Sequence, residues 1–330
     1  MNLEKETSAI DVLSPEISNN DTNVEGKPKV LSKSNHKLKA QISMHTMMIP
    51  AMLFAIVFFI LPLIGLVMAF QDYSISKGFF RSTFVDIYNF ELLFNRPDFT
   101  RAIENTVIIA LAKIIAITIL SIVIALLINE VENKILKKVI QTIIFLPYFL
   151  SWALLGNIFV DLFSLNGGVN YFLSLIGIQG EYWITSNKWF RVIVVATDVW
   201  KTLGYQVVVF LAAITSINSN LYEAADIDGA GYWQKCKYIT IPGIKPMIIL
   251  MSILNIGNIM NAGFEQILVM YNPSVYKTGD ILDTMSYRIG LVGLNYSMGT
   301  AIGLFKSVIS CVCFIIAYRI AFKVSDYKLF

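Results

Sequence analysis

The stretch Glu223-Ala224-Ala225-Asp226-Ile227-Asp228-Gly229 is followed, after nine residues, by Ile239-Thr240-Ile241-Pro242, and it separates two long apolar segments. Asn220 stands three residues before Glu223, which is the spacing of a capping box. The alanines favour a short helix, and Gly229 can end it because glycine accepts the backbone angles of a helix terminus. Residues 232–238 can form a second short helix, which we expect Pro242 and Pro246 to end as they start the next membrane segment. The stretch therefore predicts a helix–turn–helix knob at a membrane surface.

This stretch closely resembles the cytoplasmic coupling loop of ABC importer permeases, which reads E-A-A, three residues, G, nine residues, I-x-L-P. The spacing matches throughout, and Ile241 stands where the family has Leu. The resemblance implies that residues 218–243 form a coupling loop against separate ATPase subunits. Glu223 and Gly229 can also be a helix cap and a helix end, and both interpretations can hold together. The implied coupling residues are Glu223, Ala224, Ala225, Gly229, Ile239 and Pro242.

The composition indicates a membrane protein. Apolar residues make up 56% of the chain and charged residues 15%, whereas soluble domains are about a quarter charged. The net charge of +3 does not suggest nucleic acid binding. His36 and His45 lie outside any ligand cluster, so we expect no metal site. We also expect no catalytic residue.

Continuous apolar runs predict an all-α membrane protein with six transmembrane helices, because a hydrocarbon core needs about 20 helical residues. The polar residues 1–45 are expected to form a disordered cytoplasmic tail, and residues 46–330 a transmembrane permease domain. The predicted spans cover about 46–70, 103–129, 139–163, 190–217, 246–270 and 298–323.

The distribution of Lys and Arg predicts the orientation of these spans. Cationic residues are more frequent in the connections that lie inside when the N-terminus is cytoplasmic. This arrangement places both termini and residues 218–243 in the cytoplasm. We therefore expect a multi-pass protein of the bacterial plasma membrane.

Five charged residues fall within the predicted spans, and all of them lie in the outer half. Charges at this depth usually face the bundle interior or a water-filled cavity, so they suggest an outward-open vestibule. Asp198 and Lys201, at i and i+3, can alternatively neutralise each other. The set has a surplus of one cation, which an acidic sugar could compensate. It comprises Lys113, Asp198, Lys201, Glu265 and Lys306.

Amide and aromatic side chains in the spans are candidates for sugar contacts. On one continuous helix Asn258, Asn261 and Glu265 would fall within about 60° of one another. This stripe suits sugar hydroxyls, and interhelical hydrogen bonding is an equal alternative. Tyr148 and Trp152 are one helical turn apart and could stack on sugar faces, although core packing is the more common role of a single aromatic residue.

The resemblance to sugar permeases extends beyond the coupling loop, over about residues 46–330. The stretch 62–73 resembles the F-subunit class of maltose-type permeases. Residues 263–273 and 303–307 resemble the polysaccharide-type branch. The resemblance implies the type I ABC importer permease fold and a role in binding-protein-dependent uptake of a sugar, most simply an oligosaccharide.

The implied complex has further subunits. They are a second homologous permease, two cytoplasmic ATPases that bind ATP and Mg²⁺, and an extracellular sugar-binding lipoprotein. No Walker A motif is found in this chain, so no cofactor is expected in it. The alternatives are a secondary transporter, which would need an internal repeat or a coupling-ion site, and a membrane receptor or scaffold.

Overall fold

The computed structural model describes residues 33–325, which divide after Leu61 into two units. Most of the predicted disordered tail lies outside the described residues. In the first unit, α1 (Lys33–Ala55) is followed by a π-helical turn, η1 (Ile56–Ile60). Helical structure therefore begins before the predicted first span. In this part of the chain, the segment Met44–Phe70 is long and apolar enough to cross a membrane. It ends with the 3-10 helix η2 (Leu61–Phe70).

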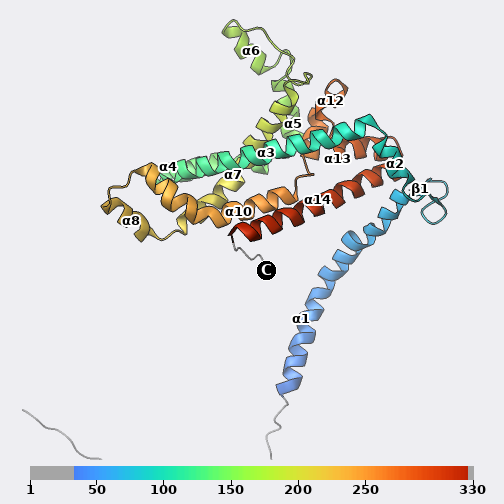
Figure 1. The fold of residues 1–330 in the computed structure, drawn as a ribbon, viewed down its shortest axis with the longest axis horizontal. Coiled ribbons are helices and arrows are strands. Elements are labelled where there is room, and N and C mark those ends of the chain that lie inside the picture. The colour runs from blue at the N-terminus through green and yellow to red at the C-terminus, as the bar shows by residue number, and fades with distance from the viewer. Residues whose placement is uncertain (1–32, 326–330) are drawn as a thin grey trace, which may run out of the picture. The chain divides into compact units, whose positions relative to one another are not determined.

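The second unit is built around four long helices. They are α3 (Pro97–Asn129), α7 (Phe190–Thr215), α10 (Ile241–Gly257) and α14 (Tyr296–Ser325). Helix α3 packs along α7, and α10 packs along α14 and also contacts α3 and α7 (Figure 1). The coupling stretch lies at one end of this bundle, beyond α10, and α12 and α13 lie toward the other end.

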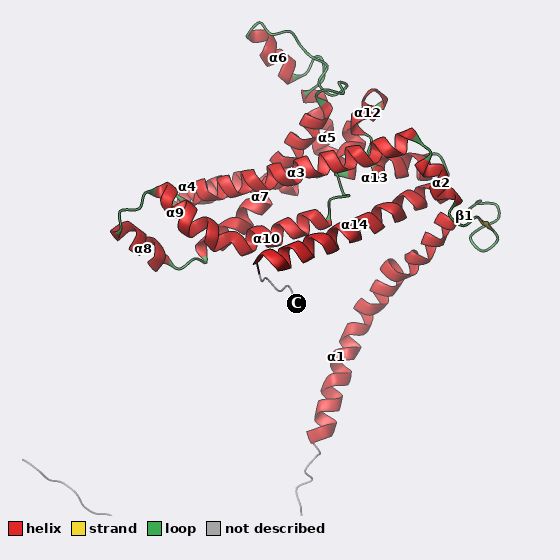
Figure 2. Cartoon of the chain, in the orientation of Figure 1, coloured by secondary structure: helices red, strands yellow, loops and turns green. Residues whose placement is uncertain are grey.

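A short antiparallel pair, β1 (Gln71–Asp72) and β2 (Thr83–Phe84), precedes α2 (Tyr88–Phe94). Within the second unit, almost all of the described chain is helix joined by loops (Figure 2). The apolar cores lie where the long helices meet. One core joins α3, α7 and α10 through residues such as Ala125, Phe210 and Ile244.

The third predicted span is present but sharply bent. Helix α4 (Lys134–Phe145) and the 3-10 turn η3 (Leu146–Phe149) meet α5 (Trp152–Leu162) at 98°. Pro147 lacks an amide N–H, and the Ser151 hydroxyl accepts from the N–H of Leu154 at 3.3 Å, so a new helix starts there. The short helix α6 (Gly168–Leu175) follows.

The fifth predicted span, 246–270, is wrong as a continuous helix. One helical run extends from Tyr232 to Gly257 through α9 (Tyr232–Lys235), the π turn η4 (Cys236–Thr240) and α10. Pro242 does start α10, as expected, but no break separates α10 from the short helix before it, because the π turn η4 joins the two. The chain then breaks at residues 258–263 before α11 (Phe264–Met270).

The break ends at Gly263, whose φ is 95°. Residues with side chains rarely adopt this left-handed conformation. The chain continues through η5 (Pro273–Val275), α12 (Tyr276–Gly279), α13 (Leu282–Ser286) and η6 (Tyr287–Val292).

The predicted fold class is confirmed. Within residues 33–325, five helices can cross a membrane, or six when the bent pair in the third segment is counted as one span.

Candidate functional site

The coupling stretch folds as a knob of two short helices, α8 (Ser219–Ile227) and α9. The N-cap of α8 is Asn218, whose side-chain oxygen accepts from the N–H of Asn220 at 3.0 Å. The predicted capping role of Asn220 is therefore wrong, because α8 begins before that residue. Gly229 does end the helix, with a φ of 74°.

Two contacts tie α8 to the helical run that follows it. Asp226 and Lys235 form an ion pair, and the hydroxyls of Tyr222 and Thr240 lie 2.9 Å apart. The knob exposes two large apolar side chains, since Ile227 is 87% and Trp233 79% exposed, beside exposed carboxylates such as that of Glu223. The knob is therefore an internally braced unit with large apolar side chains in its exposed surface.

The helix break at residues 258–263 is held by the buried side chain of Lys113 from α3. Its Nζ donates to the carbonyl oxygen of Ala262 at 2.8 Å and to Oε1 of Gln266 at 2.6 Å. The same Nζ lies 3.5 Å from the carboxylate of Asp198 on α7. Backbone groups freed by a helix break at membrane depth need such partners. Lys113 therefore supplies one of them, and Asp198 balances its charge.

Gln266 extends this network to α7. Its amide Nε2 donates to the carbonyl of Val194 and to the hydroxyl of Thr197, both at 2.8 Å. Gln266 is fully buried, and we did not predict its role. Gln266 directly follows Glu265, and neighbouring residues of a helix face different sides. The sequence therefore indicates that Gln266 does not share the side on which Glu265 lies.

The predicted polar stripe is wrong, because its three residues do not share one helix. Asn258 and Asn261 lie in the break, and Glu265 lies on α11. The break nevertheless brings both asparagines to one cavity of about 130 Å³, which Lys113 and Asp198 also line. Glu265 is exposed and is not among the residues that line this cavity.

Lys201 on α7 lies among aromatic rings instead of beside a carboxylate. Its Nζ donates to the carbonyl oxygen of Tyr148 at 3.1 Å and lies 5.5 Å and 5.6 Å from the ring centres of Tyr148 and Trp152. Asp198 interacts with Lys201 only through space. The predicted Asp198–Lys201 pair is therefore wrong, because Asp198 pairs with Lys113.

Tyr148 and Trp152 do meet at Lys201, but not as neighbours on one helix. The bend between η3 and α5 separates them. The ring of Tyr148 also stacks on Tyr205 at 5.3 Å; these tyrosines are 38% and 45% exposed, whereas Trp152 is buried. Half-exposed aromatic rings beside a cation form a surface on which a sugar could stack.

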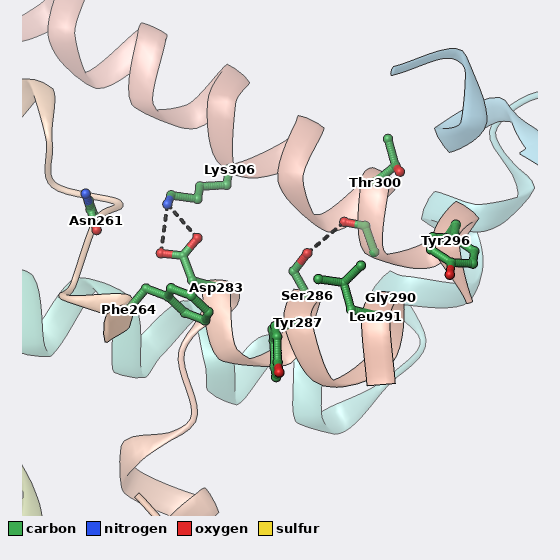
Figure 3. A pocket seen from close by; sticks show the side chains of 11 residues that line it. Asn261, Phe264, Asp283, Ser286, Tyr287, Gly290, Leu291, Tyr296, Thr300 and Lys306 are labelled. Atoms are coloured by element: carbon green, nitrogen blue, oxygen red, sulfur yellow. Dashed lines mark hydrogen bonds and ion pairs between the residues drawn. The ribbon is translucent and has the colours of Figure 1, made fainter. Parts of the chain in front are cut away.

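Lys306 on α14 is paired with a carboxylate that we did not predict. Its Nζ lies 2.6 Å and 2.8 Å from the two oxygens of Asp283 on α13 (Figure 3). Asp283 lies outside the predicted spans, so the hydropathy pattern does not single it out. Counting it removes the predicted surplus of one cation, so that argument for an acidic substrate is wrong.

A second ionic cluster fixes the segment after α11. Arg288 pairs with Asp280 at 2.7 Å and lies 4.6 Å over the ring of Tyr276, which stacks on Tyr271. Burial, with smaller contributions from Tyr276 and Asp280, raises the pKa of Tyr271 to about 12. The hydroxyl therefore stays protonated at physiological pH, and this cluster is a stable brace.

The family described as "Binding-protein-dependent transport system inner membrane component" matches residues 117–326 of this chain. Among proteins of known identity, the chain is 37% identical over 295 residues to protein LplB of Bacillus subtilis (strain 168), covering 89% of this chain and 92% of LplB. It is 32% identical to the polygalacturonan/rhamnogalacturonan transport system permease protein YteP of the same organism, covering 88% and 91%.

The fold is similar to a chain in the crystal structure of a bacterial ABC transporter involved in the import of the acidic polysaccharide alginate. The TM-score is 0.82 and the sequence identity 35%, and the match covers 89% of this chain and all of that one.

Proposed function

Since this chain belongs to the family of binding-protein-dependent transport system inner membrane components and is a permease subunit of a sugar ABC importer, we propose that it carries an acidic oligosaccharide. The chain is a multi-pass membrane protein and not an enzyme. Its family membership argues against the alternatives of a secondary transporter and of a receptor without transport.

The coupling knob is the proposed docking site of the ATPases, two subunits that bind ATP and Mg²⁺ in the cytoplasm. The large apolar side chains that it exposes, Ile227 and Trp233, support this role, because a partner subunit would bury them. The helical run Tyr232–Gly257 joins the knob directly to the break at residues 258–263. Movement of the knob is thereby transmitted to the cavity that contains Asn258 and Asn261.

The proposed sugar contacts lie at the helix break and at the aromatic surface. Broken helices near the middle of the membrane bind substrate in many transporters. Asn258 and Asn261 present amides to hydroxyls, and Tyr148 presents its ring to a sugar face, whereas Trp152 is buried in the apolar core and supports Lys201 from below the surface. Lys113 and Asp198 line the same cavity but serve chiefly to hold the break. A second homologous permease completes the path, and a sugar-binding lipoprotein delivers substrate on the side opposite the knob.

The observation that carries the acidic substrate is the environment of Lys201. Of the three lysines in the predicted set, Lys113 and Lys306 have a carboxylate within 4 Å, and Lys201 has a carbonyl and two rings. A carboxylate of the sugar would supply the counter-ion that Lys201 lacks within 4 Å among the described residues. The names of YteP and of the alginate importer support the same substrate class.

The test is uptake of galacturonate oligosaccharides and of neutral arabino-oligosaccharides by the reconstituted complex. We expect Lys201→Met to lower kcat/KM for the acidic sugars about 10- to 100-fold, since hydrogen bonds to charged groups contribute about 1.5–3 kcal/mol. Neutral sugars, where transported, should be affected less.

The matched control is Lys188→Met, which removes an exposed lysine 5.0 Å over the ring of Trp189. This variant should transport normally. Uptake of neutral oligosaccharides alone by the wild type, or unchanged acidic uptake by Lys201→Met, would refute the acidic substrate.

A further inference from the structure

A larger cavity, of about 550 Å³, lies between α11, α13, η6 and α14 (Figure 3). Its volume is within the range of about 300–1,000 Å³ that is usual for ligand pockets. Its lining combines aromatic rings, an amide, a hydroxyl and an ion pair. The residues that carry the argument are Asn261, Phe264, Asp283, Tyr287, Thr300 and Lys306.

The walls of this cavity are fixed without the ion pair. The Ser286 hydroxyl donates to the carbonyl of Gly299 at 2.9 Å. Gly290 and Gly299 pack so closely that a Cβ on Gly299 would lie 2.6 Å from the Cα of Gly290. The N–H of Leu282 also donates to the hydroxyl of Thr106 at 3.0 Å. The cavity is therefore preformed, and removal of the ion pair leaves these three contacts in place.

The ion pair presents both hydrogen-bonding roles to the cavity. Asp283 and Lys306 line it with side chains that are 20% and 22% exposed. A sugar hydroxyl can donate to the carboxylate of Asp283 and accept from the ammonium of Lys306. The ring of Phe264, 5.8 Å from that of Tyr287, supplies an apolar surface for the C–H face of a sugar.

The larger cavity shares one lining residue with the proposed sugar site. Asn261 lines both this cavity and the cavity of about 130 Å³ that contains Asn258. The smaller cavity is below the range usual for ligand pockets. An oligosaccharide that contacts Asn261 can therefore place a further residue in the larger cavity.

We propose that this larger cavity is a subsite for a further residue of the transported oligosaccharide, bound by Asp283, Lys306 and Thr300 and stacked on Phe264. The inference rests on the proposed function and adds to it a dependence on chain length. A short sugar that reaches only Asn258 and Asn261 leaves the subsite empty. Longer chains gain affinity from it.

The test uses the complete complex in proteoliposomes with galacturonate oligosaccharides of two, three, four and five residues. In the double variant Asp283→Asn/Lys306→Met, both charges are removed together, so neither is left unpaired. We expect kcat/KM for the tetra- and pentasaccharide to fall about tenfold, as for the loss of one hydrogen bond to a charged group. Uptake of the disaccharide should be unchanged.

The matched control is Arg96→Gln/Asp98→Asn, which removes an exposed ion pair of 2.8 Å that does not line the cavity. It should show no dependence on chain length. A second variant, Thr300→Val, keeps the ion pair and removes one hydroxyl. It should lower uptake of the longer sugars about threefold. If the double variant fails to assemble, uptake by Thr300→Val is the test of the subsite.

Two results would overturn the subsite while leaving the proposed function intact. One is equal transport of all chain lengths by both cavity variants. The other is an equal loss for all lengths, which would indicate that the ion pair supports the structure of the permease and not the binding of a further sugar residue. If the wild-type complex transports none of the four galacturonate sugars, the proposed acidic substrate is refuted, and the subsite inference falls with it.

Discussion

Lys113 and Lys201 are both buried lysines of the helix bundle, but their surroundings differ, and we propose different roles for them. Lys113 has a carboxylate and two hydrogen-bond acceptors, and it satisfies the carbonyl of Ala262 at a helix break. Lys201 has a carbonyl and two rings. Burial and residue type are the same for both lysines. Only the groups around them support the proposal that Lys113 is structural and that Lys201 binds a substrate anion.

At this scale, we predict that Lys113→Met destabilises the protein by about 3–5 kcal/mol, because it leaves the carboxylate of Asp198 buried without its ammonium. The measurement is the midpoint of thermal unfolding of the detergent-purified complex. The double variant Lys113→Met/Asp198→Asn should recover part of the loss, since the remaining groups are neutral. A Lys113→Met protein as stable as the wild type would show that Asp198 has another partner.

The sequence identifies most of the charged residues of the site but not their partners. Lys113, Asp198, Lys201 and Lys306 all stand out as charges within apolar runs. Their pairing depends on which helices pack together, and α3 meets α7 at Lys113 while α13 meets α14 at Asp283. Spacing along one helix therefore suggests the pair Asp198–Lys201. The ion pair that forms is between two helices, Lys113–Asp198.

Among the elements, the helical run from Tyr232 to Gly257 links the two functional regions. It starts in the coupling knob, is tied to α8 by Asp226–Lys235 and Tyr222–Thr240, and ends at the break beside Asn258. The prolines suggest a break between the short helix α9 and the long helix α10. Pro242 lies in the first turn of α10, where proline is tolerated, and the π turn η4 joins the two helices without a break.

We predict that Gly229→Val uncouples or detaches the ATPases and leaves membrane insertion intact. The φ of Gly229 is 74°, and a side chain in this left-handed region costs about 1–2 kcal/mol, more when it is β-branched. An added Cβ would meet no other group within 4 Å, so the effect comes from the backbone at the turn between α8 and α9. Co-purification of the ATPases and sugar uptake are the measurements.

The control for Gly229 is Gly231→Ala in the same loop. Gly231 has a φ of −72°, and its added Cβ would be 4.0 Å from Oε1 of Gln234, so the change should be tolerated. Full uptake and normal ATPase recovery in Gly229→Val would show that the turn is not required for coupling.

Over the whole molecule, two of the predicted spans are interrupted, and both interruptions border the candidate site. The bend at residues 150–151 separates Tyr148 from Trp152, and the break at residues 258–263 exposes Asn258 and Asn261. Hydropathy measures the length of an apolar run and predicts that spans exist. It does not detect where a cap at Ser151 or a left-handed Gly263 ends a helix within the run.

The orientation of the chain follows from its cationic loops and stays a prediction. It places the coupling knob in the cytoplasm and residues 163–189, between α5 and α7, outside. Together with the proposed function, this orientation predicts that ATP acts on the side of the knob and the binding protein on the opposite side.

The most direct measurement is sugar uptake into proteoliposomes in which these two sides can be supplied separately. With galacturonate oligosaccharides, we expect uptake only when MgATP is present on the side of the knob and the loaded binding protein on the other side. Uptake that proceeds without ATP, or that a proton or sodium gradient drives, would contradict ATP-driven import by this complex.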